Sequence, residues 1–271
     1  MVVRGGFLPA CLIGGYAFLY LPIALLIAFS FNDSRLLTSW SGFSWRWYVA
    51  LWQDAPLISA ALLSLRVAAL SATVATLIGT AAGYALARFG RFRGRGTFAA
   101  TLSVPLVLPD VIVGLSLLLL FVILQRLTGW PAERGASTIA IAHASFALAY
   151  VAVVVQARLA DAGTELEEAA MDLGASPWGA FLTITLPLMA PALVSGWLLA
   201  FTLSLDDVVV ASFVSGPGAS TLPMVLFSAM RLGVTPEMNA LATVVLALVL
   251  LALLGAWLAR RLPVAAGTPL R

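Results

Sequence analysis

Lysine is absent from this 271-residue sequence, and charge of either sign is scarce. All 15 basic residues are arginine, and with 12 acidic residues the charged fraction is only 10%, against about 25% in an average soluble protein. Without lysine the chain cannot contain the phosphate-binding motif G-x-x-x-x-G-K-[ST]. A single cysteine, Cys11, excludes an intrachain disulfide framework and a multi-thiolate metal site, and a single histidine, His143, excludes a histidine-rich metal site.

The sequence instead contains long apolar runs, and 62% of its residues are hydrophobic. A bilayer core of about 30 Å takes about 20 apolar residues as a helix. Six runs qualify, at residues 7–29, 62–87, 98–124, 137–155, 187–205 and 238–259. The first run is too long for the apolar part of a signal peptide and lacks a small-residue cleavage site, so we expect a retained helix. The predicted fold is all-α, a single polytopic membrane domain over residues 1–271 with six transmembrane helices.

The arginines predict the orientation of these helices. Short cytoplasmic loops are enriched in basic residues, and the densest arginine cluster lies between the second and third runs. A cytoplasmic position for this loop places both termini and the loop at residues 157–186 on the same side. Nine of the 15 arginines are then cytoplasmic: Arg4, Arg88, Arg91, Arg93, Arg95, Arg158, Arg260, Arg261 and Arg271. We interpret the cluster itself as a membrane-surface anchor.

Three loops are then expected on the outer side, at residues 30–56, 125–136 and 206–237. The first predicts an interfacial helix, because it is dense in rings that favour the headgroup level. These are Trp40, Trp45, Trp47, Tyr48 and Trp52. The third contains a turn at Gly216-Pro217-Gly218 and leaves two interpretations open. It is either a simple interfacial loop or a partly re-entrant hairpin, which must lie against protein or a water-filled cavity because irregular backbone is unstable in lipid.

The most polar stretch of the chain follows the fourth run. Within residues 157–186 five acids stand against Arg158: Asp161, Glu165, Glu167, Glu168 and Asp172. Residues 165–173 are good helix formers, and Gly174 is placed to end a helix in the left-handed conformation. Ser176 and Pro177 are typical of the N-cap and first residue of another helix. The sequence predicts a helix, a turn and a second helix.

This loop resembles the EAA signature of the membrane subunits of ATP-binding-cassette importers. The matching residues are Glu168, Ala169, Ala170, Gly174, Ile184, Leu186 and Pro187. Further stretches resemble the permeases of polyamine (spermidine or putrescine) importers, most closely the second, C-type permease of a putrescine system. They are Phe31-Asn32, Trp47-Tyr48, Arg88-Phe89, Pro105 to Asp110, Ser204 to Asp207 and Phe213 to Pro223. The resemblance spans nearly the whole chain and implies the type I ABC importer permease fold, with the EAA loop docked in a groove of an ATPase subunit.

The same resemblance implies a complex in the bacterial inner membrane. We expect a heterodimer with a homologous second permease, two ATPase subunits, a periplasmic polyamine-binding protein, contact with the lipid bilayer and no nucleic-acid partner. No cofactor is expected in this chain, because ATP and magnesium would bind to the ATPase. The alternatives are an importer permease for another small solute, since iron, thiamine and phosphonate systems share the signature, an ion-driven secondary transporter, and an intramembrane enzyme. Neither of the last two needs a docking loop.

Three acids are expected at membrane depth, where a charged side chain costs about 2.5–3.5 kcal/mol on insertion scales. Asp110 lies in the middle of the third run, directly after Pro109, and Asp206 and Asp207 lie at the outer end of the fifth. We expect Asp110 and one of the Asp206 and Asp207 pair to line a route for a polyamine. Their carboxylates would replace the hydration of its ammonium groups.

Aromatic faces would add cation–π attraction along this route. The candidates are Tyr150, Trp197 and Phe201. The alternative for each acid is an internal ion pair or a helix cap, above all for Asp206, which could cap the segment that follows. His143, inside the fourth run, is interpreted as a packing histidine rather than a ligand or proton relay.

Overall fold

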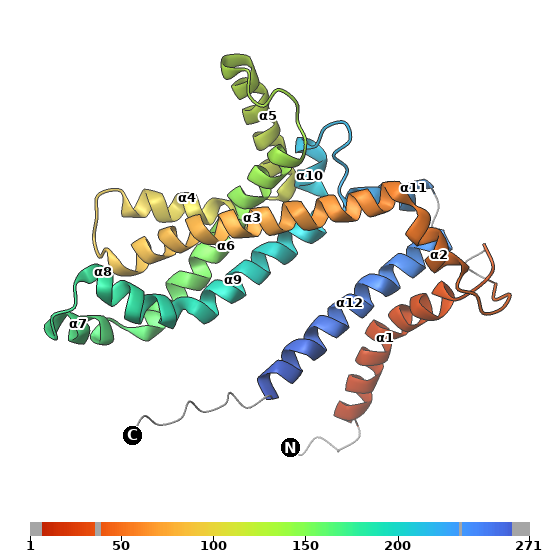
Figure 1. Cartoon of the computed structure of the whole chain (residues 1–271), viewed down its shortest axis with the longest axis horizontal. Coiled ribbons are helices and arrows are strands. Elements are labelled where there is room, and N and C mark those ends of the chain that lie inside the picture. The colour runs from red at the N-terminus through yellow and green to blue at the C-terminus, as the bar shows by residue number, and fades with distance from the viewer. Residues whose placement is uncertain (1–6, 36–38, 233–234, 262–271) are drawn as a thin grey trace, which may run out of the picture. The chain divides into compact units, whose positions relative to one another are not determined.

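The computed structural model describes residues 7–35, 39–232 and 235–261, and these ranges are helical, without a β-strand. In chain order the helices are α1 (Phe7–Ser30), α2 (Arg46–Gln53), α3 (Ala55–Arg88), α4 (Arg95–Val107), α5 (Asp110–Thr128), α6 (Ala136–Ala162), α7 (Glu165–Asp172), α8 (Pro177–Ala180), the π-helix η1 (Phe181–Thr185), α9 (Leu186–Asp206), α10 (Val209–Val214), α11 (Leu222–Leu232) and α12 (Pro236–Arg261) (Figure 1).

Five of the described helical segments are long and apolar enough to cross a membrane. They are Leu8–Ser30, Ala55–Arg88, Asp110–Thr128, Ala136–Ala162 and Pro177–Asp206. With α12, whose described apolar stretch is Pro236–Leu251, they agree with the predicted six-helix membrane fold. Arg4 and Arg271, which entered the orientation argument, lie outside the described residues.

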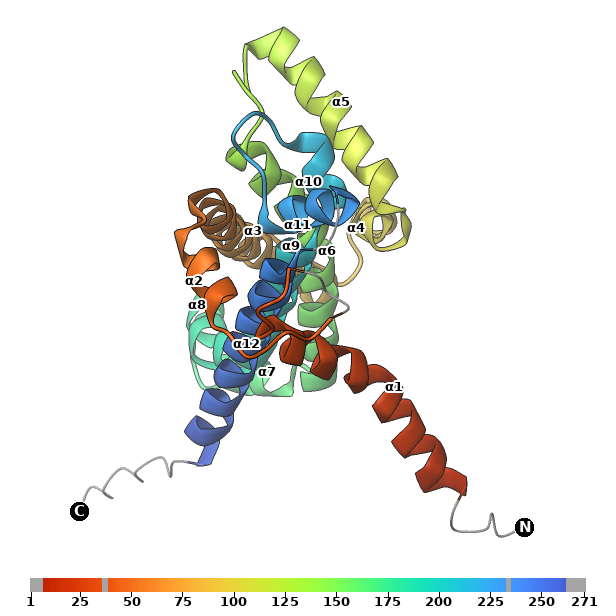
Figure 2. The ribbon, with the colours of Figure 1, turned by 90° about the vertical axis from the view of Figure 1, so that its right-hand side faces the viewer.

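The chain divides into two compact units, and the single domain over residues 1–271 remains a prediction. One unit holds the described residues up to Ile58 and from Ala229 onward. In it α12 packs against α1 and α2 (Figure 2). The Asn32 side chain donates to the Ser39 carbonyl at 2.6 Å, and its backbone oxygen accepts from Trp47 Nε1 at 2.6 Å. These bonds order the loop before α2, the helix predicted at this place.

The second unit, residues 59–228, carries the charged sites. Its centre is the pair α6 and α9, which run side by side, with α7 and α8 at one end and α10 at the other (Figure 1). One buried apolar cluster lies between α6 and α9, with Val151, Leu159 and Met189 fully or almost fully buried. A second cluster joins α10 to α5 and α6. The unit therefore has a continuous helical core against which loops are fixed.

Small residues let α3 approach α6 closely. Gly79 and Gly83 form a G-x-x-x-G pattern, a spacing that brings helix backbones together in membranes. A Cβ atom on Gly79 would lie 2.6 Å from the Leu148 carbonyl oxygen, and one on Gly83 would meet the Ala152 carbonyl oxygen. No larger side chain fits at either position without moving the helices apart.

The predicted helix over residues 98–124 is wrong as a single element, because the chain breaks into α4 and α5. Leu108 and Pro109 are extended, with ψ of 139° at both residues. A residue before proline is disfavoured in the helical conformation, and proline itself cannot continue the hydrogen-bond ladder. Asp110 is consequently the first residue of α5 rather than a mid-helix residue.

Pro187 lies at the start of α9, as the run at residues 187–205 predicts, but α9 is not a separate helix. The helical path runs without a break from Pro177 to Asp206, and Pro187 lies in the first turn of α9. The preceding five residues, Phe181–Thr185, form the π-helix η1. A wider turn at this point relieves the clash that proline makes with the carbonyl four residues earlier.

The region at residues 206–237 contains α10, a turn and α11. Val210, Ala211 and Val214 of α10 are buried in the core of the second unit. Protein therefore covers α10, as the re-entrant interpretation requires and a simple interfacial loop does not.

Candidate functional site

An acidic cavity of about 390 Å³ lies within the second unit. Three carboxylates and one phenol reach it, and they are Asp110, Asp206, Asp207 and Tyr150. The other lining residues are Pro105, Val113, Phe146, Leu203, Val208 and Val209. The structure thus gathers all three acids singled out in the sequence around one space.

Chain breaks place these acids at the cavity. Asp110 begins α5 after the extended Leu108-Pro109 pair, where the positive end of the helix dipole favours a carboxylate. Asp206 is the last residue of α9, and Asp207 is extended and turns the chain into α10. All three acids therefore lie at helix ends, close to backbone that has left the helical ladder.

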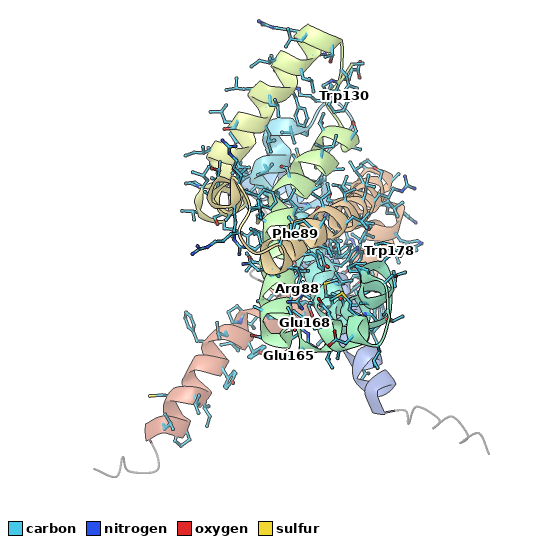
Figure 3. All side chains as sticks on the ribbon, turned by 90° about the vertical axis from the view of Figure 1, so that its left-hand side faces the viewer. Arg88, Phe89, Trp130, Glu165, Glu168 and Trp178 are labelled. Atoms are coloured by element: carbon cyan, nitrogen blue, oxygen red, sulfur yellow. The ribbon has the colours of Figure 1, made fainter. Side chains whose placement is uncertain are left out.

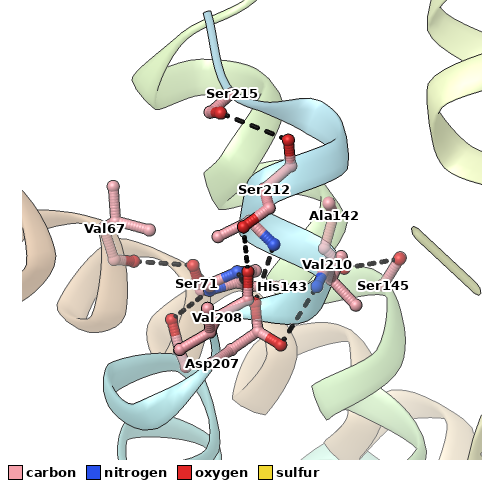
Figure 4. Close-up of polar contacts among 12 residues, drawn as sticks. Val67, Ser71, Ala142, His143, Ser145, Asp207, Val208, Val210, Ser212 and Ser215 are labelled. Atoms are coloured by element: carbon pink, nitrogen blue, oxygen red, sulfur yellow. Dashed lines mark hydrogen bonds and ion pairs between the residues drawn. The ribbon is translucent and has the colours of Figure 1, made fainter. Parts of the chain in front are cut away.

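Asp207 is held by its neighbours. Its Oδ1 accepts from the Val210 backbone N–H at 3.3 Å, and its Oδ2 accepts from the Ala211 backbone N–H at 2.7 Å. His143 Nε2 lies 3.1 Å from the same Oδ2, and the Asp207 side chain is only 9% exposed (Figure 4). The helix cap considered for Asp206 is thus made by Asp207, which leaves Asp207 little freedom to bind a solute.

Asp206 contrasts with its neighbour. Asp206 is exposed, and its carboxylate accepts no hydrogen bond from another described residue. Asp110 is likewise exposed, and it lines the same cavity as Asp206. Of the two alternatives in the fifth run, Asp206 is therefore the carboxylate available to a solute.

The aromatic residues separate into two groups. Tyr150 lines the cavity together with Phe146, one helical turn earlier on α6. Trp197 and Phe201 are not among the lining residues; they stack on each other with ring centroids 5.2 Å apart. Trp197 Nε1 also donates to Thr73 Oγ1 at 3.1 Å. The i, i+4 relation to Tyr150 is the sequence signal that identifies Phe146.

The predicted helix, turn and helix are confirmed at residues 165–180. α7 ends in a Schellman motif, in which Ala175 N–H donates to the Ala170 carbonyl and Gly174 N–H to the Met171 carbonyl. Gly174 has φ of +92°, the left-handed conformation expected of it. Ser176 Oγ then accepts from Gly179 N–H at 3.1 Å and caps α8, with Pro177 as its first residue.

The EAA residues form two groups in this loop, one in and just after α7 and the other where η1 enters α9. Glu168, Ala169 and Gly174 are exposed, and Ala170 is half-buried. Ile184 and Leu186 are half-buried and Pro187 is exposed at the base, where η1 enters α9. At the tip, Leu173 is 90% exposed and Trp178 is 68% exposed, so the loop presents apolar side chains beside its acids (Figure 3).

Arg88 was assigned to a membrane-surface anchor, and the structure corrects this. Its side chain is 9% exposed, and its guanidinium pairs with Glu167 of α7, with Nη2 2.9 Å from Oε1. It also donates to the carbonyls of Leu159 at 3.0 Å and Gly163 at 2.6 Å. The end of α3 is thereby tied to the start of the docking loop.

The other three arginines of the cluster also differ from one another in their surroundings. Arg95, the first residue of α4, donates to the carbonyls of Leu86 near the end of α3 and of Gly90 in the loop, whereas Arg91 and Arg93 are exposed. Only the exposed pair is consistent with the anchor interpretation. The sequence signal for a structural role of Arg88 is its position directly after the small-residue pattern of the helix that it ends.

Comparison with known proteins places this geometry in context. Residues 75–263 match the family described as binding-protein-dependent transport system inner membrane component. The chain is 57% identical over 245 residues to the putrescine transport system permease protein PotI of Escherichia coli strain K12, covering 90% of this chain and 87% of that protein. It is 43% identical over 260 residues to the spermidine/putrescine transport system permease protein PotC of the same strain, covering 96% and 94%.

A crystal structure of a bacterial ABC transporter involved in the import of the acidic polysaccharide alginate is also similar. It aligns with a TM-score of 0.69 over 97% of this chain and 99% of that chain, at 16% identity. At this identity the likeness concerns the fold alone.

Proposed function

The chain belongs to the family of binding-protein-dependent transport system inner membrane components, and we propose that it is the permease subunit through which polyamines, putrescine foremost, cross the membrane. The observation that carries the proposal is the cavity in which Asp110, Asp206 and Asp207 converge. A polyamine is an extended cation, and carboxylates can replace the water around its ammonium groups. The names of the relatives at 57% and 43% identity support the same substrate class.

Within the cavity we assign contact with the solute to Asp110 and Asp206. Both are exposed to it, whereas Asp207 is occupied with α10 and His143. Tyr150 and Phe146 line the same space, and an aromatic ring there would add attraction for an ammonium group. Two free acids suit a dication, because each would balance one of its charges.

The docking loop supplies the connection to an energy source. Its tip combines the exposed Leu173 and Trp178 with the carboxylates of Glu165 and Glu168, which suits a groove with an apolar floor and basic rim. The matching EAA residues, from Glu168 to Pro187, are assigned to contact with an ATPase subunit. The chain has no lysine for a P-loop, so ATP and magnesium would bind to that subunit.

The complete importer would comprise this permease, a homologous second permease, two ATPase subunits and a periplasmic polyamine-binding protein. Both termini and the docking loop would face the cytoplasm of a bacterial cell. ATP binding would close the ATPases, move the docking loops and open the permease pair outward to accept a polyamine. Hydrolysis would return it to the inward-open state.

The test is ATP hydrolysis by the co-purified complex in proteoliposomes. Binding protein is added with putrescine, with spermidine or empty. Stimulation by an amine-loaded binding protein supports the proposal, and the stronger amine identifies the preferred substrate. Equal hydrolysis with loaded and empty binding protein would reject the polyamine assignment and leave an importer for another small solute.

A second condition in the same vesicles tests the alternative that the protein is an ion-driven transporter. Uptake is measured with the ion gradients held and ATP left out. We expect no uptake, since the docking loop has a purpose only if a partner hydrolyses ATP. Uptake without ATP would overturn the coupling part of the proposal.

A further inference from the structure

We propose that His143 is a positioning residue that holds the Asp207 carboxylate against α10, so that Asp206 and Asp110 are the acids that meet the cation. The inference rests on the proposed function, since it assigns separate roles to the acids of that cavity. It concerns a residue that sequence reasoning treats as packing.

His143 joins three helices through two ring nitrogens. It lies on α6 and is fully buried. Nδ1 is 2.6 Å from Ser204 Oγ in the last turns of α9, and Nε2 is 3.1 Å from Asp207 Oδ2 (Figure 4). The same Oδ2 accepts from the Ala211 N–H of α10. The chain of contacts therefore runs from α6 through Asp207 to the first turn of α10.

The contact with Asp207 is close but off the hydrogen-bond axis. Nε2 lies within ion-pair distance of Oδ2, yet it has no hydrogen-bond partner of good geometry among the described residues. A buried imidazole nitrogen without a partner is costly. Among the described residues, Asp207 is the group placed to compensate Nε2, and rotation of its carboxylate away from His143 would be unfavourable.

This restraint matters because of what surrounds Asp207. The other ionisable groups that line the cavity with Asp207 are Asp206, which precedes it in the chain, Asp110 and Tyr150. Released from His143, the Asp207 carboxylate could turn into the cavity beside Asp206. Three free acids would then hold a dication more tightly than two and slow its exit. A role limited to packing would predict no dependence on which ring nitrogen is kept.

Two substitutions of His143 distinguish the contributions of its two ring nitrogens, because each keeps the contact of only one. The amide of His143→Gln reaches the position of Nε2 and can donate to Asp207, whereas the shorter amide of His143→Asn reaches the position of Nδ1 and keeps only the Ser204 contact. His143→Leu removes both contacts and preserves bulk. Each variant is purified in the full complex and reconstituted, and co-purification of all subunits is checked.

The measured quantity is the ratio of putrescine uptake to binding-protein-stimulated ATP hydrolysis in the same vesicles. We expect His143→Gln to keep the ratio within about twofold of the wild type, and His143→Asn to lower it at least fivefold. A structural defect would lower uptake and hydrolysis together and leave the ratio unchanged. If His143→Leu fails to assemble, the Asn and Gln pair still decides.

Equal ratios for the Asn and Gln variants would overturn the positioning role. Failure of the proposed function has a different signature, namely that the wild-type complex itself takes up no amine. The wild-type control of the same experiment therefore distinguishes failure of the positioning role from failure of the proposed function.

Discussion

The guanidinium of Arg88 and the carboxylate of Glu167 are 79 residues apart in sequence and form an ion pair at 2.9 Å. The pair fastens the end of α3 to α7, the helix that carries Glu168, Ala169 and Ala170 of the EAA residues. Two further bonds, to the carbonyls of Leu159 and Gly163, add the end of α6. A movement of the docking loop would therefore be passed to two membrane helices at once.

Replacement of Arg88 by alanine should uncouple this connection. The variant leaves Glu167 and two carbonyls without their donor, and a bond to a charged group contributes about 1.5–3 kcal/mol. We expect at least a tenfold loss of uptake with a smaller loss of ATP hydrolysis in reconstituted complexes. Arg88→Lys keeps the charge but loses the planar fork and should be intermediate.

Arg91→Ala is the matched control for Arg88. It removes an exposed arginine from the same loop, and we expect uptake within twofold of the wild type. A loss as large as that of Arg88→Ala would show that the charge of the loop, rather than the tie to α7, is what transport requires.

Gly174→Ala should weaken the turn between α7 and α8. A Cβ at this position meets no atom within 4 Å, so the cost comes only from the left-handed backbone, φ +92°, and amounts to about 1–2 kcal/mol. We expect weaker retention of the ATPase during purification. Gly174→Asn should retain more of it, because asparagine tolerates this conformation better. Equal retention by the alanine variant and the wild type would contradict the turn's role.

Gly79→Ala tests the close contact between α3 and α6. Its Cβ would approach the Leu148 carbonyl oxygen to 2.6 Å, and overpacking of this kind costs about 1–3 kcal/mol. We expect a lower thermal unfolding midpoint in detergent. Gly96→Ala in α4 is the control, since its Cβ meets nothing within 4 Å and alanine favours a helix. A midpoint unchanged by Gly79→Ala would refute the packing argument.

Local patterns predicted much of this architecture. Apolar run length predicted the long helices, and the order Gly174, Ser176, Pro177 predicted the end of α7 and the start of α8, because caps depend on neighbouring residues alone. The break at Leu108-Pro109 was readable only in part. Pro109 indicated a bend, but a proline kink and a complete break have the same local sequence signal.

Contacts between distant segments could not be read in this way. The sequence does not say that Arg88 meets Glu167, or that His143 lies beside Asp207, since both contacts depend on how distant helices pack. Trp197 and Phe201 illustrate the same limit. They lie on α9 like Asp206, but they stack on each other instead of lining the cavity.

The proposed contact of Asp110 and Asp206 with the transported cation is tested most directly by putrescine uptake per ATP hydrolysed in proteoliposomes. The complexes carry Asp110→Asn, Asp206→Asn or, as a control, Asp161→Asn, which neutralises an exposed acid at the end of α6 outside the cavity lining. We expect at least a tenfold lower ratio for each cavity variant and a ratio within twofold of the wild type for the control. Wild-type ratios for both cavity variants would contradict it.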